Sequence, residues 1–187
     1  TYKKGVAFKS KDYTKKGKKI VRVSNFTKNS IDIKDCNFIE DNKAKEYEDF
    51  TLHANDIIIA TVGSWPHNPD SVVGKVVKVP LIAHNSLLNQ NAVRLRTKKV
   101  DMQVWLFFCL THNEFSPFIV SGAQGSANQA SVTLEHVFSY KIVFLTKNNG
   151  LFIFFDKINH ISELIRNENY FLQLFLKIIL SKMAKDI

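Results

Sequence analysis

The feature that most restricts the fold is a short apolar run, residues 57–60, that ends in a segment rich in chain-breaking residues. The stretch from Asn55 reads NDIIIATVGSWPHNP. An apolar run this short, bounded by turn residues, is typical of a buried strand. Glycine and proline directly after it predict a loop. We therefore expect a core strand that presents a polar loop, residues 63–69, at the rim of a sheet.

The composition bounds the class of protein. Of the 187 residues, 45% are hydrophobic and 23% are charged, which favours a domain with a substantial core over a disordered chain. Two cysteines, Cys36 and Cys109, are too few for a disulfide framework or a zinc cluster. No apolar run approaches the roughly 20 residues that span a bilayer, and no leader is apparent. We expect a cytoplasmic protein without a membrane partner, and its start at Thr1 suggests a piece of a longer chain.

The formal charge of +9 is unevenly distributed. Residues 1–22 contain nine lysines and arginines against a single acid, Asp12, and residues 61–100 contain six against Asp70. Clustered cations favour a surface that binds a polyanion, because lysines near phosphates release counterions. The alternative is a solvated face of a lysine-rich protein.

Periodicity predicts a mixed α+β domain. Strands are expected at residues 19–26, 57–61, 72–79, 92–95 and 140–145. Helical segments are expected at residues 46–52, at 101–115 with an end before Pro117, and from a cap at Ser131 or Thr133 through Val137. Between them, residues 121–131 (SGAQGSANQAS) consist almost entirely of amide, hydroxyl and small residues, and we expect an irregular loop there.

The last part of the chain has a different pattern. From Phe152 onward, apolar residues recur at spacings of three, four and seven, which predicts a long helix. The apolar surface is wider than a thin seam, so a partner helix is implied. We therefore divide the chain into a compact mixed β-sheet domain with short helices, residues 1–148, and a long packing helix, residues 149–187.

Enzymatic patterns are weak in this sequence. None of the six histidines is paired with Cys, Asp or Glu at the spacing of a metal site. Gly122 and Gly125 lack the lysine of a phosphate loop, and Gly63-Ser64 lacks the flanking glycines of a nucleophile elbow. We expect no catalytic, cofactor-binding or metal-binding residues in this chain.

Short motifs follow one another in an order that carries a resemblance. They are GVAF at 5–8 with Tyr13 and Gly17, IVRVSN at 20–25, YEDFTL at 47–52, DIIIATVG at 56–63, NQN at 89–91, the helix to Phe115, GAQGS at 122–126 with Gln129, and LEHVFSYKIVF at 134–144. In this order they resemble the target recognition domain of a type I restriction-modification DNA specificity subunit. The likeness covers roughly residues 5–145 and rests on the order of the motifs, since each one alone is short.

The resemblance implies a compact α/β recognition domain followed by a long helix. In that family the helix packs against a counterpart helix and spaces two recognition domains. One departure is that the family usually continues its last strand into a proline-rich segment with a Glu-Gln pair, whereas residues 147–150 (KNNG) lead directly into LFIFF. The chain is then half of a specificity subunit, a half-size subunit that dimerises, or a domain fused to an adenine-N6 methyltransferase.

The function that the resemblance implies is sequence-specific recognition of double-stranded DNA, without catalysis, that directs an adenine-N6 methyltransferase subunit or fused domain. S-adenosylmethionine would belong to that methyltransferase part. Amide side chains suit base reading and cations suit phosphates. The expected DNA-binding residues are Lys18, Lys19, Arg22, Ser24, Asn25, Ser64, Trp65, His67, Asn68, Asn89, Gln90, Asn91, Gln124, Ser126, Asn128 and Gln129.

Each expectation has a structural alternative. Asp56 and Gly63 fix a turn, Trp65 anchors its loop, residues 89–91 bond loop backbone, and Gln129 ties its own loop to the domain. The alternative function is a non-enzymatic scaffold whose C-terminal helix recruits partner proteins and whose charge is incidental. An enzyme acting on small polar substrates is a third possibility.

Overall fold

The apolar run at residues 57–60 forms strand β5 (Ile57–Ala60) inside a four-stranded antiparallel sheet. The order of this sheet is β1-β9-β5-β7, with β1 at Tyr2–Lys4, β9 at Ala92–Leu95 and β7 at Val76–Lys78. Side chains of β5 alternate between two buried clusters: Ile57 and Ile59 face one, Ile58 and Ala60 the other. The run is apolar throughout because both faces of the sheet are covered.

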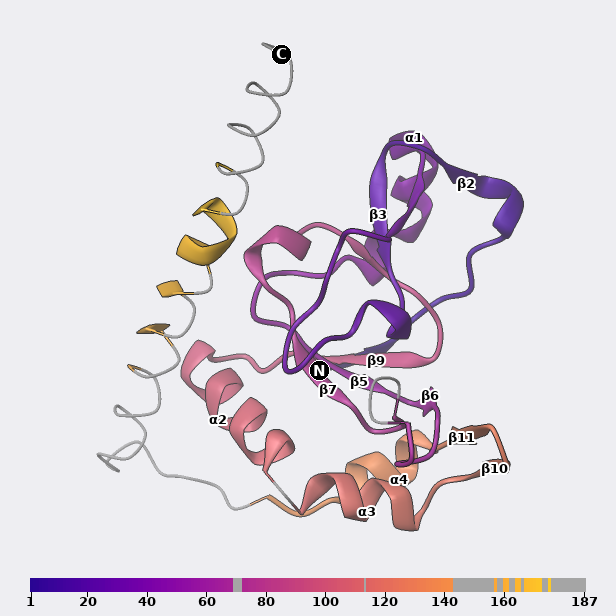
Figure 1. Cartoon of the computed structure of the whole chain (residues 1–187), viewed down its shortest axis with the longest axis vertical. Helices are drawn as coiled ribbons and strands as arrows, with labels where there is room; N and C mark the ends of the chain where they lie inside the picture. Colours follow the sequence, from indigo (N-terminus) through magenta and orange to yellow (C-terminus); the bar gives the residue numbers. More distant parts are fainter. Residues whose placement is uncertain are drawn as a thin grey trace, which may run out of the picture. The chain divides into compact units, whose positions relative to one another are not determined.

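The computed structural model describes residues 1–68, 72–112, 114–142, 157, 160–161, 164–165, 167–172 and 175. The chain divides into two compact units, Thr1–Phe144 and Leu145–Ile187. In its described residues the first unit is a mixed α+β domain of several small sheets and short helices (Figure 1), which confirms the α+β part of the expected fold class.

A second sheet has the order β2-β4-β3-β8. Its strands are β2 (Tyr13–Thr14), β4 (Asn37–Ile39), β3 (Lys18–Val21) and β8 (Leu87–Leu88). Strand β3 runs parallel to β8. Around this sheet lie short helical turns: η1 (Ser10–Asp12), η2 (Val23–Asn25), α1 (Asp41–Ala44), η3 (Lys45–Phe50) and η4 (Leu81–Ala83). The helical turn η3 agrees with the one expected at 46–52.

Helices cover the Ile57 and Ile59 face of the central sheet. They are α2 (Val100–Thr111), α3 (Phe115–Ser121) and α4 (Leu134–Ser139). Phe115 and Ile119 of α3 are fully buried in this cluster. The expectation of one helix ending before Pro117 was wrong. The chain leaves the helix at His112 and begins α3 at Phe115, and Pro117 fits its first turn, where a backbone donor has no intrahelical partner.

Three other expected elements differ from the structure. The strand at 19–26 ends at Val21, because the Asn25 side chain accepts a hydrogen bond from the Arg22 amide (2.9 Å) and closes a helical turn. Of residues 72–79, the segment Val76–Lys78 is extended in the sheet. Residues 140–142 form no strand, and the rest of that expected element lies outside the described residues.

The described residues of the second unit, between 157 and 175, are helical. The rest of the helix expected over residues 149–187 lies outside the described residues, so its full length stays a prediction. Within the described part of the chain, no helix combines the length and apolarity that crossing a membrane requires.

Candidate nucleic-acid interface

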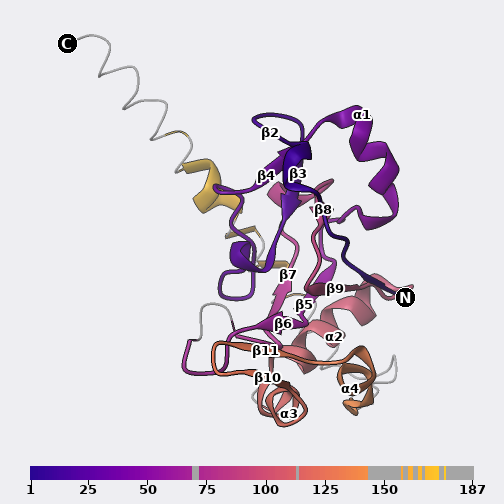
Figure 2. The ribbon, with the colours of Figure 1, turned by 90° about the vertical axis from the view of Figure 1, so that its right-hand side faces the viewer.

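The two polar segments that stood out in the sequence meet in one small sheet. Residues 121–131 form a hairpin of β10 (Gln124–Ser126) and β11 (Gln129–Ser131) rather than an irregular loop. Strand β11 also pairs with β6 (Val62–Gly63), in the register Ala130 to Gly63. Figure 2 shows β6, β11 and β10 side by side at one end of the unit. The hairpin therefore holds the loop that follows Gly63 beside it.

Two glycines allow the hairpin to form where it does. Gly125 has a φ of +156°, and a Cβ there would overlap the carbonyl oxygen of Gln129 on the facing strand. A Cβ on Gly122 would overlap the ring of His136. That ring stacks on Phe118 with 4.4 Å between centroids, so α3, the hairpin and α4 are packed together at this point. As expected, the Thr133 hydroxyl caps α4 by accepting from the His136 amide (3.2 Å).

Trp65 anchors the loop to the hairpin. Its Nε1 donates to the backbone oxygen of Ser126 at 2.7 Å, and its ring packs against the core cluster around Ile57. Ser64 is buried, and its hydroxyl donates to the backbone oxygen of Asn68 at 2.8 Å. The structural alternative for Trp65 is therefore confirmed, and the rest of the loop is free to present Pro66, His67 and Asn68 to solvent.

Six polar side chains from this small sheet and its loop are exposed together. We name them the amide edge: His67, Asn68, Gln124, Ser126, Asn128 and Gln129. All six were expected to bind DNA. The set contains four side-chain amides, each of which carries both a donor and an acceptor. Strand pairing holds the backbone of Gln124, Ser126 and Gln129, and the Trp65 bond to Ser126 ties the loop to this hairpin.

Residues 89–91 have a mainly structural role. Asn89 is buried, and its backbone N–H donates to the backbone oxygen of Val21 at 2.9 Å. Asn91 has a φ of +70°, and its oxygen accepts from the amides of Thr61 (2.8 Å) and Val62 (3.2 Å). The backbone of this turn thus supports the junction between β5 and β6, while Gln90 is exposed.

The expected phosphate contacts lie apart from the amide edge and are partly engaged within the domain. The Lys18 ammonium donates to the Thr51 hydroxyl at 3.1 Å, and the Arg22 guanidinium donates to the backbone oxygen of Asp35 at 2.9 Å. Asn25 is buried, Lys19 is half-buried and Ser24 is exposed. Asn25 is therefore placed as a turn-closing residue rather than as a surface contact.

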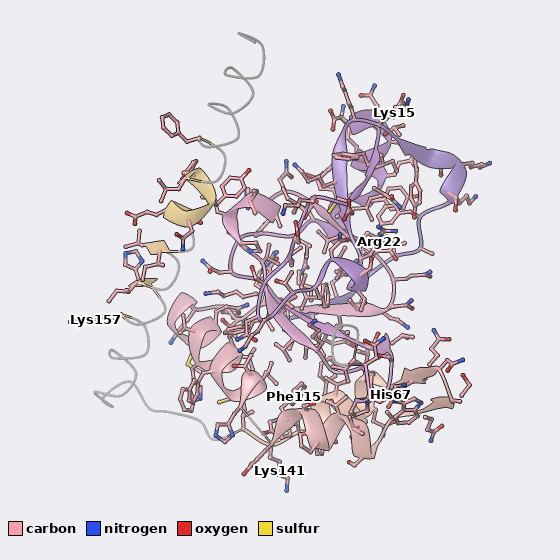
Figure 3. All side chains as sticks on the ribbon, viewed as in Figure 1. Lys15, Arg22, His67, Phe115, Lys141 and Lys157 are labelled. Atoms are coloured by element: carbon pink, nitrogen blue, oxygen red, sulfur yellow. The ribbon has the colours of Figure 1, made fainter. Side chains whose placement is uncertain are left out.

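Other lysines of the basic start are exposed to solvent. The exposed ones are Lys4, Lys9, Lys11, Lys15 and Lys16. Figure 3 places Lys15 and His67 at opposite ends of the first unit. The exposed lysines and the exposed amides therefore lie in different parts of the first unit.

A buried ion pair explains part of the basic excess at residues 61–100. Asp56 is 2% exposed and accepts two hydrogen bonds from Arg96, at 2.7 and 2.6 Å, and one from the His53 amide at 2.7 Å. The bond to Asp56 raises the pKa of Arg96. Burial lowers the pKa of Arg94, whose guanidinium donates to the backbone oxygen of Thr51 at 2.7 Å. Asp56 therefore fixes a turn, as the structural alternative held.

One buried amide was missed in the sequence. The side chain of Gln103 in α2 accepts from the Thr97 backbone N–H (2.7 Å) and donates to the backbone oxygens of Asn55 and Leu95, both at 3.0 Å. It links the helix to the end of the central sheet. A glutamine among the apolar residues of this helix could have indicated a buried amide in the sequence.

Metal ligands do not gather in the described part of the chain: no three His, Cys, Asp or Glu side chains there are grouped to hold an ion. Burial raises the pKa of both cysteine thiols, which favours their neutral form. The amide edge itself offers amide, hydroxyl and imidazole groups, which can form hydrogen bonds.

Neither the protein-family models nor the curated proteins give a match to this chain. The resemblance to a type I recognition domain therefore rests on the ordered motifs, and the function has to be argued from the amide edge itself.

Proposed function

We propose that this chain recognises double-stranded DNA by sequence and directs an adenine-N6 methyltransferase to its target within a restriction-modification type system. The observation that carries the proposal is the amide edge, in which two segments distant in the sequence, paired through Gly63 and Ala130, present exposed amide and hydroxyl groups on one small sheet. The chain itself is proposed to be non-catalytic. The methyl donor, S-adenosylmethionine, would bind to the methyltransferase.

The chemistry of the amide edge suits base reading. Asn and Gln can form two hydrogen bonds with the major-groove edge of adenine, and each such pair discriminates against other bases by about 1 to 3 kcal/mol. Strand pairing holds the hairpin before binding, so little ordering entropy is lost on contact. These features favour recognition of bases over general attraction to a polyanion.

The exposed lysines near the start of the chain suit phosphate contact. Lys15 and Lys16 lie in the turn between β2 and β3, where both are exposed. Each lysine that contacts a phosphate releases counterions and makes the affinity depend on salt. Because they are remote from the amide edge, they are proposed to orient the duplex without contributing to sequence preference.

A second candidate function is favoured by one observation on the second unit. Large apolar side chains on its described helical residues are at least half exposed: Ile161, Leu164, Ile165, Phe171, Leu172 and Phe175. Such a surface suits a partner helix. In the DNA proposal the partner is the counterpart helix or a second recognition domain, whereas in the scaffold alternative recruitment of a partner is the whole function.

Selection from a pool of random duplexes tests the proposal. The intact chain is expected to enrich one sequence pattern, and its affinity for that pattern should fall as salt rises. Enrichment of no pattern at any salt concentration would overturn DNA reading and leave the scaffold alternative.

A further inference from the structure

The β10–β11 hairpin has one polar face and one buried face. Gln124 pairs with Ser131 and Ser126 with Gln129 in the strand register, while Gly125 pairs with Ala130. Cross-strand partners and residues two apart point to the same side of a ribbon. The four polar side chains Gln124, Ser126, Gln129 and Ser131 therefore share one face. Ala130, on the other face, is fully buried in the core cluster that includes Ile59.

The polar face is open to solvent and its backbone is held from behind. All three residues of β10 are exposed, and in β11 Gln129 and Ser131 are exposed while Ala130 is buried. The Trp65 indole bonds the Ser126 backbone oxygen in β10, and β6 pairs with β11, so both strands of the ribbon are tied to the domain. Its other long edge, β10, has no further strand beside it in the described sheet.

A two-stranded ribbon with an exposed polar face is suited to one kind of ligand, double-stranded DNA. The major groove of B-form DNA is about 12 Å wide and admits a two-stranded ribbon. The two glutamines on the polar face match the donor and acceptor pair that adenine presents in that groove. Since this face carries no charge, it would contribute to discrimination between bases through hydrogen bonds and not to electrostatic attraction of the phosphates.

We infer that the β10–β11 ribbon enters the major groove, where Gln124 and Gln129 each bond one adenine. This inference rests on the proposed function and adds to it the groove, the base and the two residues that read it. The glutamines belong to different cross-strand rows, which are two residues apart along the ribbon. Two residues of antiparallel strand span about 6.8 Å. With base pairs about 3.4 Å apart, the two adenines lie about two steps apart along the duplex.

The test uses the pattern that the wild-type chain selects from random duplexes. Each adenine in it is replaced in turn by 7-deazaadenine, which lacks the N7 acceptor but still pairs with thymine. Wild-type affinity should fall about 10- to 100-fold at two positions, about two steps apart. Gln124→Ala should abolish the loss at one of these positions, and Gln129→Ala at the other.

Asn42→Ala is the matched control. Asn42 is an exposed amide in α1, and Figures 1 and 2 both show α1 and the ribbon at opposite ends of the unit. This variant should keep the wild-type response to every 7-deazaadenine duplex. Circular dichroism of each variant shows whether it is folded. Gln129→Glu, which keeps the size of the side chain, should abolish the same 7-deazaadenine effect as Gln129→Ala.

The outcomes separate the inference from the function on which it rests. If the selected pattern contains no critical adenine, or if both glutamine variants respond like wild type, the ribbon does not read adenine although the chain still reads DNA. If the wild-type chain selects no pattern, the proposed function fails and the inference with it.

Discussion

At the scale of single residues, several polar groups that resemble functional ones hold the domain together. Asp56 is the clearest case, because its buried carboxylate accepts bonds from Arg96 and from the His53 amide. A buried carboxylate is stable as long as its partners remain. The ion pair therefore belongs to the fold, and its loss should affect stability before function.

Replacing Arg96 by methionine tests this role. The change keeps much of the side-chain volume but leaves the Asp56 carboxylate, 3% exposed, without its cation. We expect the free energy of unfolding to fall by about 3 kcal/mol, as for one partner of a buried pair. Urea denaturation measures it. Lys98→Met, at an exposed cation in the same segment, should leave stability nearly unchanged, and equal effects of the two variants would contradict the assignment.

A second pair should give a pH-dependent contribution to stability. The Lys43 ammonium, 2.6 Å from Asp12, holds the pKa of that carboxyl below its ordinary value of 3.8 through a hydrogen bond. A carboxyl with a lowered pKa stabilises the fold above its ordinary pKa, and the contribution is lost as pH falls through the lower pKa of the folded state.

The Lys43→Met variant makes this contribution measurable. Its melting temperature should lie below that of the wild type at neutral pH, and the difference should shrink as pH falls below 3.8. NMR titration of Asp12 should give a higher pKa in the variant. A difference in melting temperature that is independent of pH would show that Lys43 acts by packing alone.

At the scale of elements, the hairpin depends on glycine at position 125. A methyl group there would overlap the Gln129 oxygen, and a φ of +156° is unfavourable for other residues. Gly125→Ala should therefore disturb pairing of β10 with β11 at a cost of about 1 to 3 kcal/mol. Hydrogen exchange at the hairpin amides should become faster.

The control for this variant lies in the same hairpin. Ala127 is in its exposed turn, so Ala127→Gly changes a residue of similar size without overlap. It should leave the exchange of the strand amides close to wild type. Faster exchange in both variants to the same degree would mean that the hairpin is weakly formed and that position 125 has no special role.

Local patterns in the sequence predicted some elements and misplaced others. Strand β5 and the Thr133 cap were recognisable because burial on both faces and a hydroxyl before a helix leave local signals. The hairpin at 124–131 was read as a loop, because its strands contain glycine and amides of low strand propensity. Its strand β11 pairs with β6, where Ala130 faces Gly63 from a distant part of the chain, and no local pattern reveals such a contact.

The same reason explains which of the expected site residues are exposed and which are buried. Exposed amides such as Gln124 and Gln129 were identified by residue type alone. Asn25 and Asn89 have the same chemistry but are buried, and burial follows from tertiary packing. The lysine-rich start predicted a basic surface, but Lys18 is bonded to Thr51 within the domain.

At the scale of the whole molecule, the proposal assigns phosphate contact and base contact to separate parts of the first unit. The double variant Lys15→Ala with Lys16→Ala should weaken binding to all duplexes alike. It should also reduce the slope of log affinity against log salt by about 2, because two phosphate contacts are lost. Gln129→Ala should change sequence preference and keep the slope. The same response from both would contradict the separation.

The most direct test of the central claim is NMR titration of the intact, isotopically labelled chain with its selected duplex, observed at the side-chain amide groups. We predict that the NH₂ resonances of Gln124, Asn128 and Gln129 shift on binding while that of Asn42 stays in place. If the resonances of the amide edge remained unmoved while other parts of the domain shifted, the duplex would lie on another surface and the account would be wrong.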